Sequence, residues 1–432
     1  MRRLLSSFLA PLRARHAADP ALFWHGCLFW SFWTGIVLFP SGYGFREVSP
    51  LVCALFLALY YRHGWKNSTL ARLRPRPLFW CAALMTLIGI LFSGNVWQSF
   101  LHAGMGVNKG YILPFIAMEC VRDERDLRRL VTACGLACFW EGLDGLWQAF
   151  SGVDFIMGYA PREGRLSGSF ADYAVGNYIA LAMLPVFGCW FLLRRRWSVA
   201  ISAALFAALL LPPAFLLVGS GTRSGVLAVA SSAAFWMLLR GGLRWRYPLI
   251  AAAIFGAFAL LRQGRLSPGA IGADGRWSLW SLGWNVFLEH PWFGAGAGQY
   301  NAAFRALGLV PERDVITISH PHNLYLDILC AHGAVGFLLG MIFLFGFLFW
   351  GWARLRPQLV RELEEGGPSC YWRMTAWFWI AYAAWFVNGI FGHDFYRIWW
   401  LALSMTHMGI MIGAVVNAPA APSATATPEE TP

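Results

Sequence analysis

The sequence predicts an all-α membrane protein with about twelve transmembrane helices. The chain has 432 residues, of which 58% are apolar and 13% are charged, whereas a soluble domain has roughly 25% charged residues. Apolar segments of about 17–25 residues recur along most of the chain, which is the length that an α-helix needs to cross a bilayer. A transmembrane β-barrel would instead show short alternating strands.

Twelve apolar spans follow one another, with boundaries that sequence patterns define only to within several residues. The span at 98–118 is the weakest because it contains His102 and Lys109. The span at 48–61 is short enough to be tilted or partly re-entrant. The twelve predicted spans are 22–39, 48–61, 78–93, 98–118, 127–150, 173–193, 198–218, 223–239, 247–261, 334–353, 372–391 and 397–416.

The spacing of these spans divides the chain into four parts. Residues 1–261 contain nine helices with short loops, and 262–333 form the one long polar interval, which is too rich in Trp, Phe and Leu to be disordered. Residues 334–416 contain three more helices, and 417–432 are a tail rich in Ala, Pro and Thr that is predicted to be disordered. The basic amino terminus precedes an apolar span without a small-residue cleavage site, which favours a retained first helix over a cleaved signal.

The distribution of basic residues predicts that both termini are cytoplasmic. With the amino terminus inside, 23 of the 34 Lys and Arg residues fall on the cytoplasmic side, 10 fall on the other side, and Lys109 lies within a span. Cytoplasmic loops of membrane proteins are enriched in Lys and Arg, so the loop at 262–333 is predicted to face outward. The net charge of +12 therefore reflects topology, and no run of basic and aromatic residues indicates nucleic-acid binding.

The nine cysteines and the ten outward cations carry different information. Eight cysteines lie in or beside apolar spans without a C-x-x-C pair, so we interpret them as small buried apolar side chains.

The ten outward cations are all Arg, although an outward loop normally avoids cations. A guanidinium binds phosphate through two parallel hydrogen bonds, which an ammonium cannot do. The alternative is that these arginines contact lipid headgroup phosphates.

The segment His320-Pro321-His322-Asn323 is the leading candidate for catalysis. Pro321 fixes its own φ and favours an extended His320, and the apolar pattern of 323–331 predicts a helix that begins beside His322. A helix amino terminus disfavours the imidazolium, which suits a general base. The alternatives are two surface histidines that cap a loop, and a zinc pair. An i, i+2 spacing is not a helical ligand pair, and the sequence offers no obvious third ligand.

Three further motifs gather glycine, hydroxyl groups and arginine at outward ends of the predicted helices. The motif at 219–224 is a candidate anion nest at a helix start, or an ordinary interhelical turn. The glycines of the motif at 289–298 allow a close backbone approach to a helix or ligand rather than forming a dinucleotide site. The motifs are Gly219-Ser220-Gly221-Thr222-Arg223-Ser224; Arg165-Leu166-Ser167-Gly168-Ser169-Phe170 with Arg162 before it and Asn177 after it; and Arg276-Trp277 followed by Glu289-His290-Pro291-Trp292-Phe293-Gly294-Ala295-Gly296-Ala297-Gly298.

In this order on a twelve-helix frame, these motifs resemble those of the O-antigen ligases, whose superfamily includes O-antigen polymerases and O-linked oligosaccharyltransferases. The resemblance spans about 165–340, and the His-Pro-His-Asn form favours a ligase. It implies a GT-C-like glycosyltransferase in the inner membrane of a Gram-negative bacterium, with its active site in a periplasmic loop. The residues that carry it are Arg165, Gly168, Phe170, Asn177, Ser220, Arg223, Arg276, the turn from His290 to Gly296, His322, Asn323, Leu326 and the segment from Gly333 to Gly336.

The resemblance also implies a reaction. A glycan moves from undecaprenyl pyrophosphate to a sugar hydroxyl of the lipid A–core oligosaccharide, without ATP or another cofactor. His322 would act as the base, with Asn323 and His320 in support, and the transfer would invert the anomeric carbon. The pyrophosphate would be bound by arginines instead of a metal ion, since the first outward loop has one carboxylate. Those arginines are Arg223 and Arg276, followed by Arg165 and Arg162, with Ser220 and Asn177 as supporting residues.

Two alternatives use different acceptors or a different activity. A polymerase or a protein O-oligosaccharyltransferase would share the donor and differ in the acceptor. A flippase or secondary transporter would carry ionisable groups near the bilayer midplane. Here the predicted spans hold few such groups, namely Lys109, Glu141, Asp144 and, near a boundary, Asp172. The clustering of polar residues at one face favours an enzyme.

Overall fold

The computed structural model of the chain describes residues 14, 16–106, 110–171, 174–241, 276–308, 320–392 and 395–419. Within these ranges the regular structure is helical, apart from an isolated antiparallel bridge between Arg162 and Arg165, so the all-α prediction is confirmed. The first half contains α2 (Pro20–Leu38), α3 (Tyr43–Gly64), α4 (Thr69–Arg72), α5 (Leu78–Leu91), α6 (Val96–Gly106), α7 (Leu113–Glu119), α8 (Glu124–Ser151), α9 (Val175–Ala182) and α10 (Phe187–Arg194).

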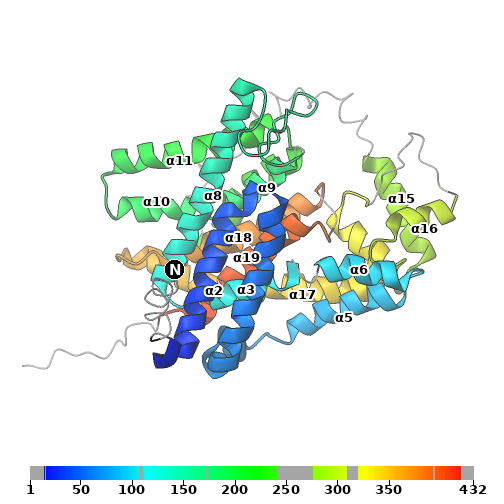
Figure 1. Ribbon diagram of the computed structural model, residues 1–432, viewed down its shortest axis with the longest axis horizontal. Coiled ribbons are helices and arrows are strands. Elements are labelled where there is room, and N and C mark those ends of the chain that lie inside the picture. The colour runs from blue at the N-terminus through cyan, green and yellow to red at the C-terminus, as the bar shows by residue number, and fades with distance from the viewer. Residues whose placement is uncertain are drawn as a thin grey trace, which may run out of the picture.

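The remaining described helices follow from residue 199 onward. These are α11 (Val199–Gly219), α12 (Arg223–Arg240), α15 (Arg276–Glu289), α16 (Tyr300–Ala306), α17 (Leu324–Glu365), α18 (Tyr371–Gly389) and α19 (Ile398–Val416). Figure 1 shows α18 and α19 in the middle of the molecule, with α2 and α3 beside them and α10 and α11 at one side. The predicted ninth span, 247–261, and the tail beyond 419 lie outside the described residues.

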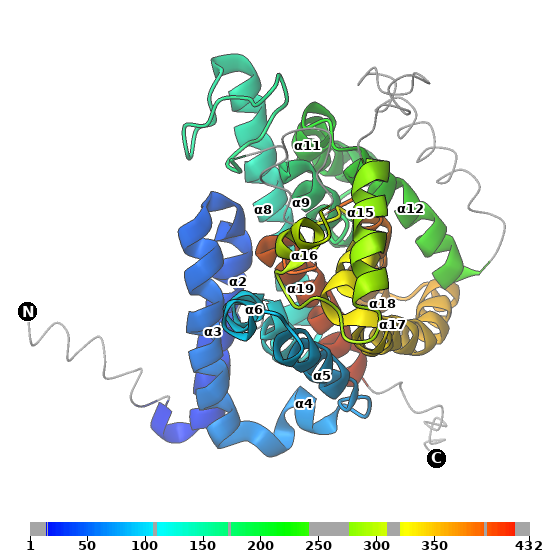
Figure 2. The same cartoon turned by 90° about the vertical axis from the view of Figure 1, so that its right-hand side faces the viewer.

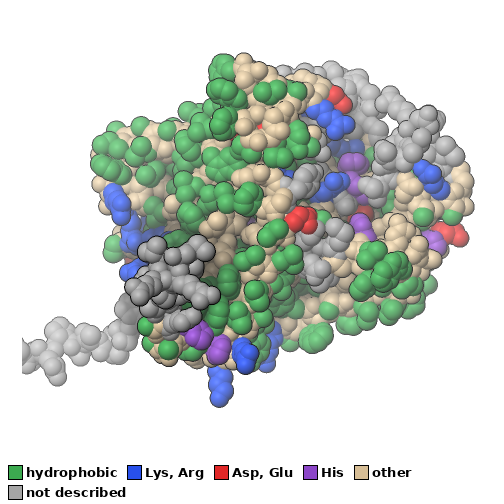
Figure 3. Space-filling model, in the orientation of Figure 1, with side chains coloured by type: hydrophobic (Ala, Val, Ile, Leu, Met, Phe, Trp, Pro, Cys, Tyr) green, Lys and Arg blue, Asp and Glu red, His purple; other side chains and the backbone are tan. Residues whose placement is uncertain are grey.

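Six helical segments in the described part are long and apolar enough to cross a membrane. This finding is consistent with a polytopic membrane protein, while the number of twelve spans remains a prediction. Hydrophobic side chains cover much of the face in Figure 3, as expected for a protein surrounded by lipid. The six segments are Pro20–Ser41, Gly44–Asn67, Val175–Arg194, Val199–Gly219, Leu324–Glu365 and Ile398–Val416.

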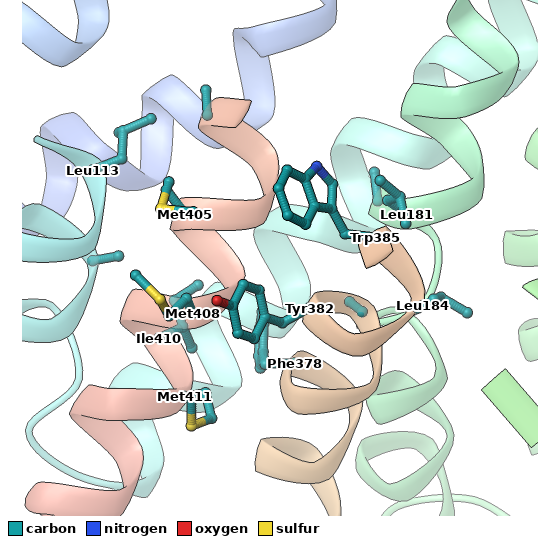
Figure 4. Close-up of a cluster of buried hydrophobic side chains, with 14 of the residues drawn as sticks. Leu113, Leu181, Leu184, Phe378, Tyr382, Trp385, Met405, Met408, Ile410 and Met411 are labelled. Carbon is teal, nitrogen blue, oxygen red and sulfur yellow. The ribbon is translucent and has the colours of Figure 1, made fainter. Parts of the chain in front are cut away.

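The centre of the core is the contact between α18 and α19, where nearly every side chain is buried. Figure 4 shows Phe378, Tyr382 and Trp385 of α18 facing the methionines and Ile410 of α19. Large aromatic rings fill most of the space between the helices, and flexible methionines fill the irregular gaps that the rings leave. Because α19 also packs on α7 and α9, this pair fixes the positions of the loops that flank it.

Several predicted spans differ in extent from the observed helices. In the weak span at 98–118, α6 ends at Gly106 and α7 begins at Leu113, and 107–109 lie outside the described residues, so the continuity of this span is not tested. Pro114, at the second position of α7, lacks the backbone N–H that a continuous helix would need there. The span predicted at 48–61 is part of the 22-residue helix α3, which includes Pro50 and is therefore not short.

A kink in α17 separates its first turns from the remainder of the helix. Gly333 has φ +61° and ψ −170°, and a Cβ atom there would lie 2.3 Å from the backbone carbon of Trp292. The loop after α15 occupies this notch: the backbone N–H groups of Ala295 and Gly296 donate to the carbonyl oxygens of Cys330 and Ala331, at 2.8 and 3.1 Å. The glycines therefore allow a close backbone approach, as the sequence predicted.

The helices α15 and α16 cover the first turns of α17. Figure 1 shows them at the right of the molecule, and Figure 2, which views that side face on, shows them next to each other near the middle; α15 packs on both α16 and α17. Gly283 of α15 makes this contact possible, since a Cβ atom there would lie 2.7 Å from the side chain of Leu326. The start of α17, which follows the His-Pro-His-Asn segment, is consequently enclosed.

Candidate active site

The His-Pro-His-Asn segment ends at the amino terminus of α17, as predicted. Asn323 is the N-cap, and its side-chain oxygen accepts hydrogen bonds from the backbone N–H groups of Tyr325 and Leu326, both at 3.0 Å. His322 precedes the cap and has φ +53°, a left-handed conformation that few residues other than glycine adopt. Its backbone N–H donates to Nδ1 of His320 at 3.2 Å. The two imidazoles are therefore held together, with ring centroids 4.1 Å apart.

The hydrogen bond from His322 to Gly392 determines the tautomer of the imidazole. Nδ1 of His322 lies 3.3 Å from the carbonyl oxygen of Gly392. A carbonyl oxygen can only accept, so Nδ1 carries the proton in the neutral ring and the lone pair is on Nε2. A neutral imidazole with its lone pair on Nε2 can accept a proton from a substrate hydroxyl.

Arg276 and Arg397 reach the same place from two other helices. Arg276 is the first residue of α15, and its guanidinium carbon lies 5.8 Å from the ring centroid of Phe391, the neighbour of Gly392. Arg397 is the N-cap residue of α19, and its Nη2 lies 3.4 Å from Nε2 of His320, which is buried. Arg397 thus contacts the histidine pair, and Arg276 contacts the residue beside Gly392.

A second cluster combines the Arg165 loop with the turn between α11 and α12. Nε of Arg165 donates to the carbonyl oxygen of Ser220 at 2.6 Å, and the N–H of Leu166 donates to Gly219. Gly221 has φ +65°, and a Cβ atom there would lie 2.9 Å from Nε of Arg165. Arg223 begins α12 immediately after this turn.

The other two predicted residues of this cluster have supporting contacts. Arg162 forms a pair of backbone hydrogen bonds with Arg165, each of 3.0 Å, which closes the loop. Ser220 is fully buried, and its hydroxyl donates to Leu217 and contacts the hydroxyl of Thr222. The structure therefore brings Arg162, Arg165, Ser220 and Arg223 together.

A chain of buried side-chain hydrogen bonds joins this cluster to the loop beside His322. The side-chain oxygen of Asn177 in α9 accepts from Oγ of Ser224 and from Nδ2 of Asn388, both at 2.9 Å. The side-chain oxygen of Asn388 accepts from Nε1 of Trp400 at 2.8 Å. Ser224 follows Arg223, and Asn388 lies one turn before Gly392. Asn177 therefore fixes the helices that carry the two clusters relative to each other.

Sequence reasoning missed three residues with defined positions near the site. Arg397 was counted only as an outward cation, and Asp327, in the first turn of α17, accepts from the backbone N–H of Phe395 at 2.8 Å. Arg46 is buried, donates to the carbonyl oxygens of Phe39 and Pro40 at 3.0 Å, and lies 3.8 Å from the ring centroid of Phe170. A signal was available for each arginine, since each is a cation on the side where cations are rare.

The loop and helix after α15 form one wall of the region. The hydroxyl of Tyr300 in α16 donates to the carbonyl oxygen of Leu279 at 3.1 Å. Burial raises the pKa of this phenol well above its ordinary value, so Tyr300 remains a neutral donor at all physiological pH values. No group of three or more His, Cys, Asp or Glu side chains that could hold a metal ion occurs among the described residues.

Residues 208–341 match the model of a family described as O-Antigen ligase. The match begins in α11 and ends in α17, so it includes Arg223, Arg276 and the segment from His320 to Asn323. Arg162, Arg165, Asn177 and Arg397 lie outside the matched residues. No curated protein matches the chain.

Proposed function

Because the match at 208–341 supports assigning the chain to the O-antigen ligase family, we propose that it transfers O-antigen from undecaprenyl pyrophosphate to a sugar hydroxyl of the lipid A–core oligosaccharide. The reaction would take place on the periplasmic face of the inner membrane. The observation that carries this proposal is the hydrogen bond between Nδ1 of His322 and the carbonyl oxygen of Gly392. With the proton on Nδ1, Nε2 would be the base, with Arg397 against His320 and Arg276 against Phe391.

In the proposed step, Nε2 of His322 takes the proton of the acceptor hydroxyl as its oxygen attacks the anomeric carbon. The bond between that carbon and the pyrophosphate oxygen breaks, and undecaprenyl pyrophosphate leaves with the electron pair. One such base contributes about 10²–10⁴-fold to the rate. Attack from the face opposite the leaving group inverts the anomeric configuration. A retained configuration in the product would contradict this mechanism.

Arginine side chains are proposed to stabilise the charge that collects on the departing pyrophosphate. Arg223 at the start of α12 and Arg276 at the start of α15 are the leading candidates. The backbone N–H groups at both helix starts favour the same anion. Arg165 and Arg162 would act behind them, held by the turn at Ser220. Arg397 joins this set because its guanidinium contacts His320.

The decisive experiment is transfer by the purified full chain. Lipid-linked O-antigen and lipopolysaccharide that lacks O-antigen are incubated with the protein, without nucleotide or added metal, and ligated product is detected by gel electrophoresis. EDTA should leave the rate unchanged, whereas inhibition that a divalent ion reverses would contradict binding by arginine. Extension of the lipid-linked glycan would identify a polymerase, and transfer to protein would identify an oligosaccharyltransferase.

A further inference from the structure

A separate polar pocket lies at the other end of the helices from His322. Its volume is about 420 Å³, and it is lined by the ends of α2, α3, α7 and α19 together with α4. The 19-residue helix α19 runs from Arg397 to this pocket, whose lining includes Val416 and Asn417. At 1.5 Å per residue the helix spans about 28 Å, which is close to the thickness of the apolar core of a bilayer. With α19 crossing the bilayer as predicted, the pocket lies at the level of the opposite headgroup layer.

The lining of this pocket carries both signs of charge. Arg72 and Arg122 contribute guanidinium groups, and Asp19 and Glu119 contribute carboxylates. Glu119 is buried, and its oxygens accept from the backbone N–H groups of Thr69 and Leu70 at 2.8 and 2.9 Å. Asp19 is exposed at the start of α2, where one of its oxygens caps the helix by accepting from the N–H of Leu22.

The two arginines are held in place by their neighbours. Nη2 of Arg72 donates to the side-chain oxygen of Asn417, and its Nε donates to the carbonyl oxygen of Ser68 at 3.3 Å. Nε of Arg122 lies 3.3 Å from a carboxylate oxygen of Asp126. Each guanidinium has five N–H donors, so these contacts leave donors of each group for an anion in the pocket.

His25 provides an independent indication of a ligand. The residue lines the pocket, is 1% exposed, and has Nε2 2.8 Å from the carbonyl oxygen of Glu119. Since that oxygen can only accept, Nε2 bears the proton and Nδ1 is an acceptor. Among the described residues Nδ1 has no hydrogen-bond partner. A buried acceptor of this kind calls for a donor that the described residues do not supply, such as the N–H of an ammonium group.

We propose that the pocket binds a phosphoethanolamine headgroup of a membrane lipid. Its phosphate would contact Arg72 and Arg122, and its ammonium would contact Asp19 and Nδ1 of His25. Leu22, which lines the pocket and is 55% exposed, offers an apolar surface for the acyl chains. A free phosphoethanolamine compound has the same charged groups without those chains, so the two sources can be distinguished.

The test measures lipid retention by the full chain in detergent with native mass spectrometry. The added ligands are phosphatidylethanolamine, phosphatidylcholine, phosphatidylglycerol and soluble glycerophosphoethanolamine. We expect phosphatidylethanolamine to bind at least about tenfold more tightly than phosphatidylcholine, whose quaternary ammonium has no N–H to donate. Equal binding of these two lipids, or preferred binding of phosphatidylglycerol, would overturn the proposal. Equal binding of glycerophosphoethanolamine would overturn the assignment to a lipid.

Matched variants locate the binding in the pocket. Arg72→Gln and Asp19→Asn should each reduce retention of phosphatidylethanolamine about tenfold; asparagine can still cap α2. Arg62→Gln and Glu364→Gln make the same charge changes at exposed positions outside the pocket and should leave retention unchanged. Equal effects of Arg72→Gln and Arg62→Gln, in proteins with unchanged melting temperatures, would show that only the net surface charge matters and would refute the site.

Discussion

The two ends of the helix bundle hold their arginines in different ways. We call them the His322 end, where α12, α15, α17 and α19 begin, and the Arg122 end, where α2 and α8 begin. At the Arg122 end several arginines contact carboxylates: Nη2 of Arg128 lies 2.7 Å from Glu124, and Nε of Arg373 lies 2.8 Å from Glu362, whereas Arg72 donates to the carbonyl oxygen of Ser68. At the His322 end the contacts of Arg46 and Arg165 include backbone carbonyl oxygens.

This difference indicates different tasks for the same side chain. A carboxylate balances the charge of a guanidinium, which suits a residue that anchors a loop at the membrane surface. A carbonyl oxygen orients a guanidinium without contributing a full negative charge, and Arg165 is one of the residues proposed to meet the pyrophosphate. Substitutions at the His322 end should therefore lower the rate of glycan transfer. Substitutions at the Arg122 end should change that rate little.

The largest contrast is expected between two histidines. We predict that His322→Ala lowers glycan transfer about 10²–10⁴-fold, because the acceptor hydroxyl loses its base, while the protein still inserts and folds. His63→Ala, at an exposed position of the Arg122 end, serves as the control and should leave transfer unchanged. Both are compared in the purified transfer assay. Near-normal ligation by the His322 variant would exclude this residue as the base.

The next contrast concerns arginine geometry. Arg223→Lys keeps the charge and loses the planar pair of donors, so we expect transfer to fall roughly 10–100-fold through lost hydrogen bonds to phosphate. Arg128→Lys makes the same change at the Arg122 end, where it should lower neither transfer nor melting temperature appreciably. Rates at saturating donor are the measurement. Full activity of Arg223→Lys would mean that the positive charge alone is sufficient.

A third contrast compares the two glycines that bound the main part of α17. Gly333 and Gly366 both have φ +61°, so alanine costs about 1–2 kcal/mol of backbone strain at either position. At Gly333 the new Cβ would also lie 2.3 Å from the backbone of Trp292, whereas at Gly366 no atom of the described residues would lie within 4 Å of it. Gly333→Ala should therefore lower the melting temperature more than Gly366→Ala does, and it should also reduce glycan transfer. Equal melting temperatures would show that the notch adapts without cost.

The smallest contrast tests buried hydrogen bonds that side chains of α18 form. Asn388→Leu removes the hydrogen-bond partner of Asn177 and Trp400. Each buried group that loses its hydrogen bond in this way costs about 1–3 kcal/mol of stability. Thr375→Val, near the Arg122 end of the same helix, removes a hydroxyl that donates only to Tyr371 in its own helix, and should cost less. Thermal unfolding in detergent gives both values. A larger loss for Thr375→Val would contradict a bridging role for Asn388.

Part of the candidate site was predictable from local sequence. Asn323 followed by an apolar pattern identified a helix start, and that start places His322 before α17. The glycines from Gly294 to Gly298 predicted a close backbone approach, which the notch at Gly333 confirms. These features depend on neighbours in the chain, where residue preferences act directly. The length of α3 was underestimated, because average hydropathy does not detect where a helix continues beyond its apolar segment.

Other features of the site depend on residues that are distant in sequence. Gly392 is separated by 70 residues from His322, and Asn388 by 211 residues from Asn177. No local pattern relates such positions, because they meet only through the packing of α9, α17, α18 and α19. Arg397 and Asp327 were underestimated for the same reason.

By itself, the sequence determined that the chain forms apolar helices, that arginine is its cation on the predicted outward side, and that a histidine precedes a capped helix. Hydropathy, charge and capping are properties of short segments, so they can be read without knowing the fold. The tertiary structure decided which carbonyl oxygen accepts a hydrogen bond from Nδ1 of His322 and which arginine contacts its neighbour His320, because those contacts exist only once the helices have packed.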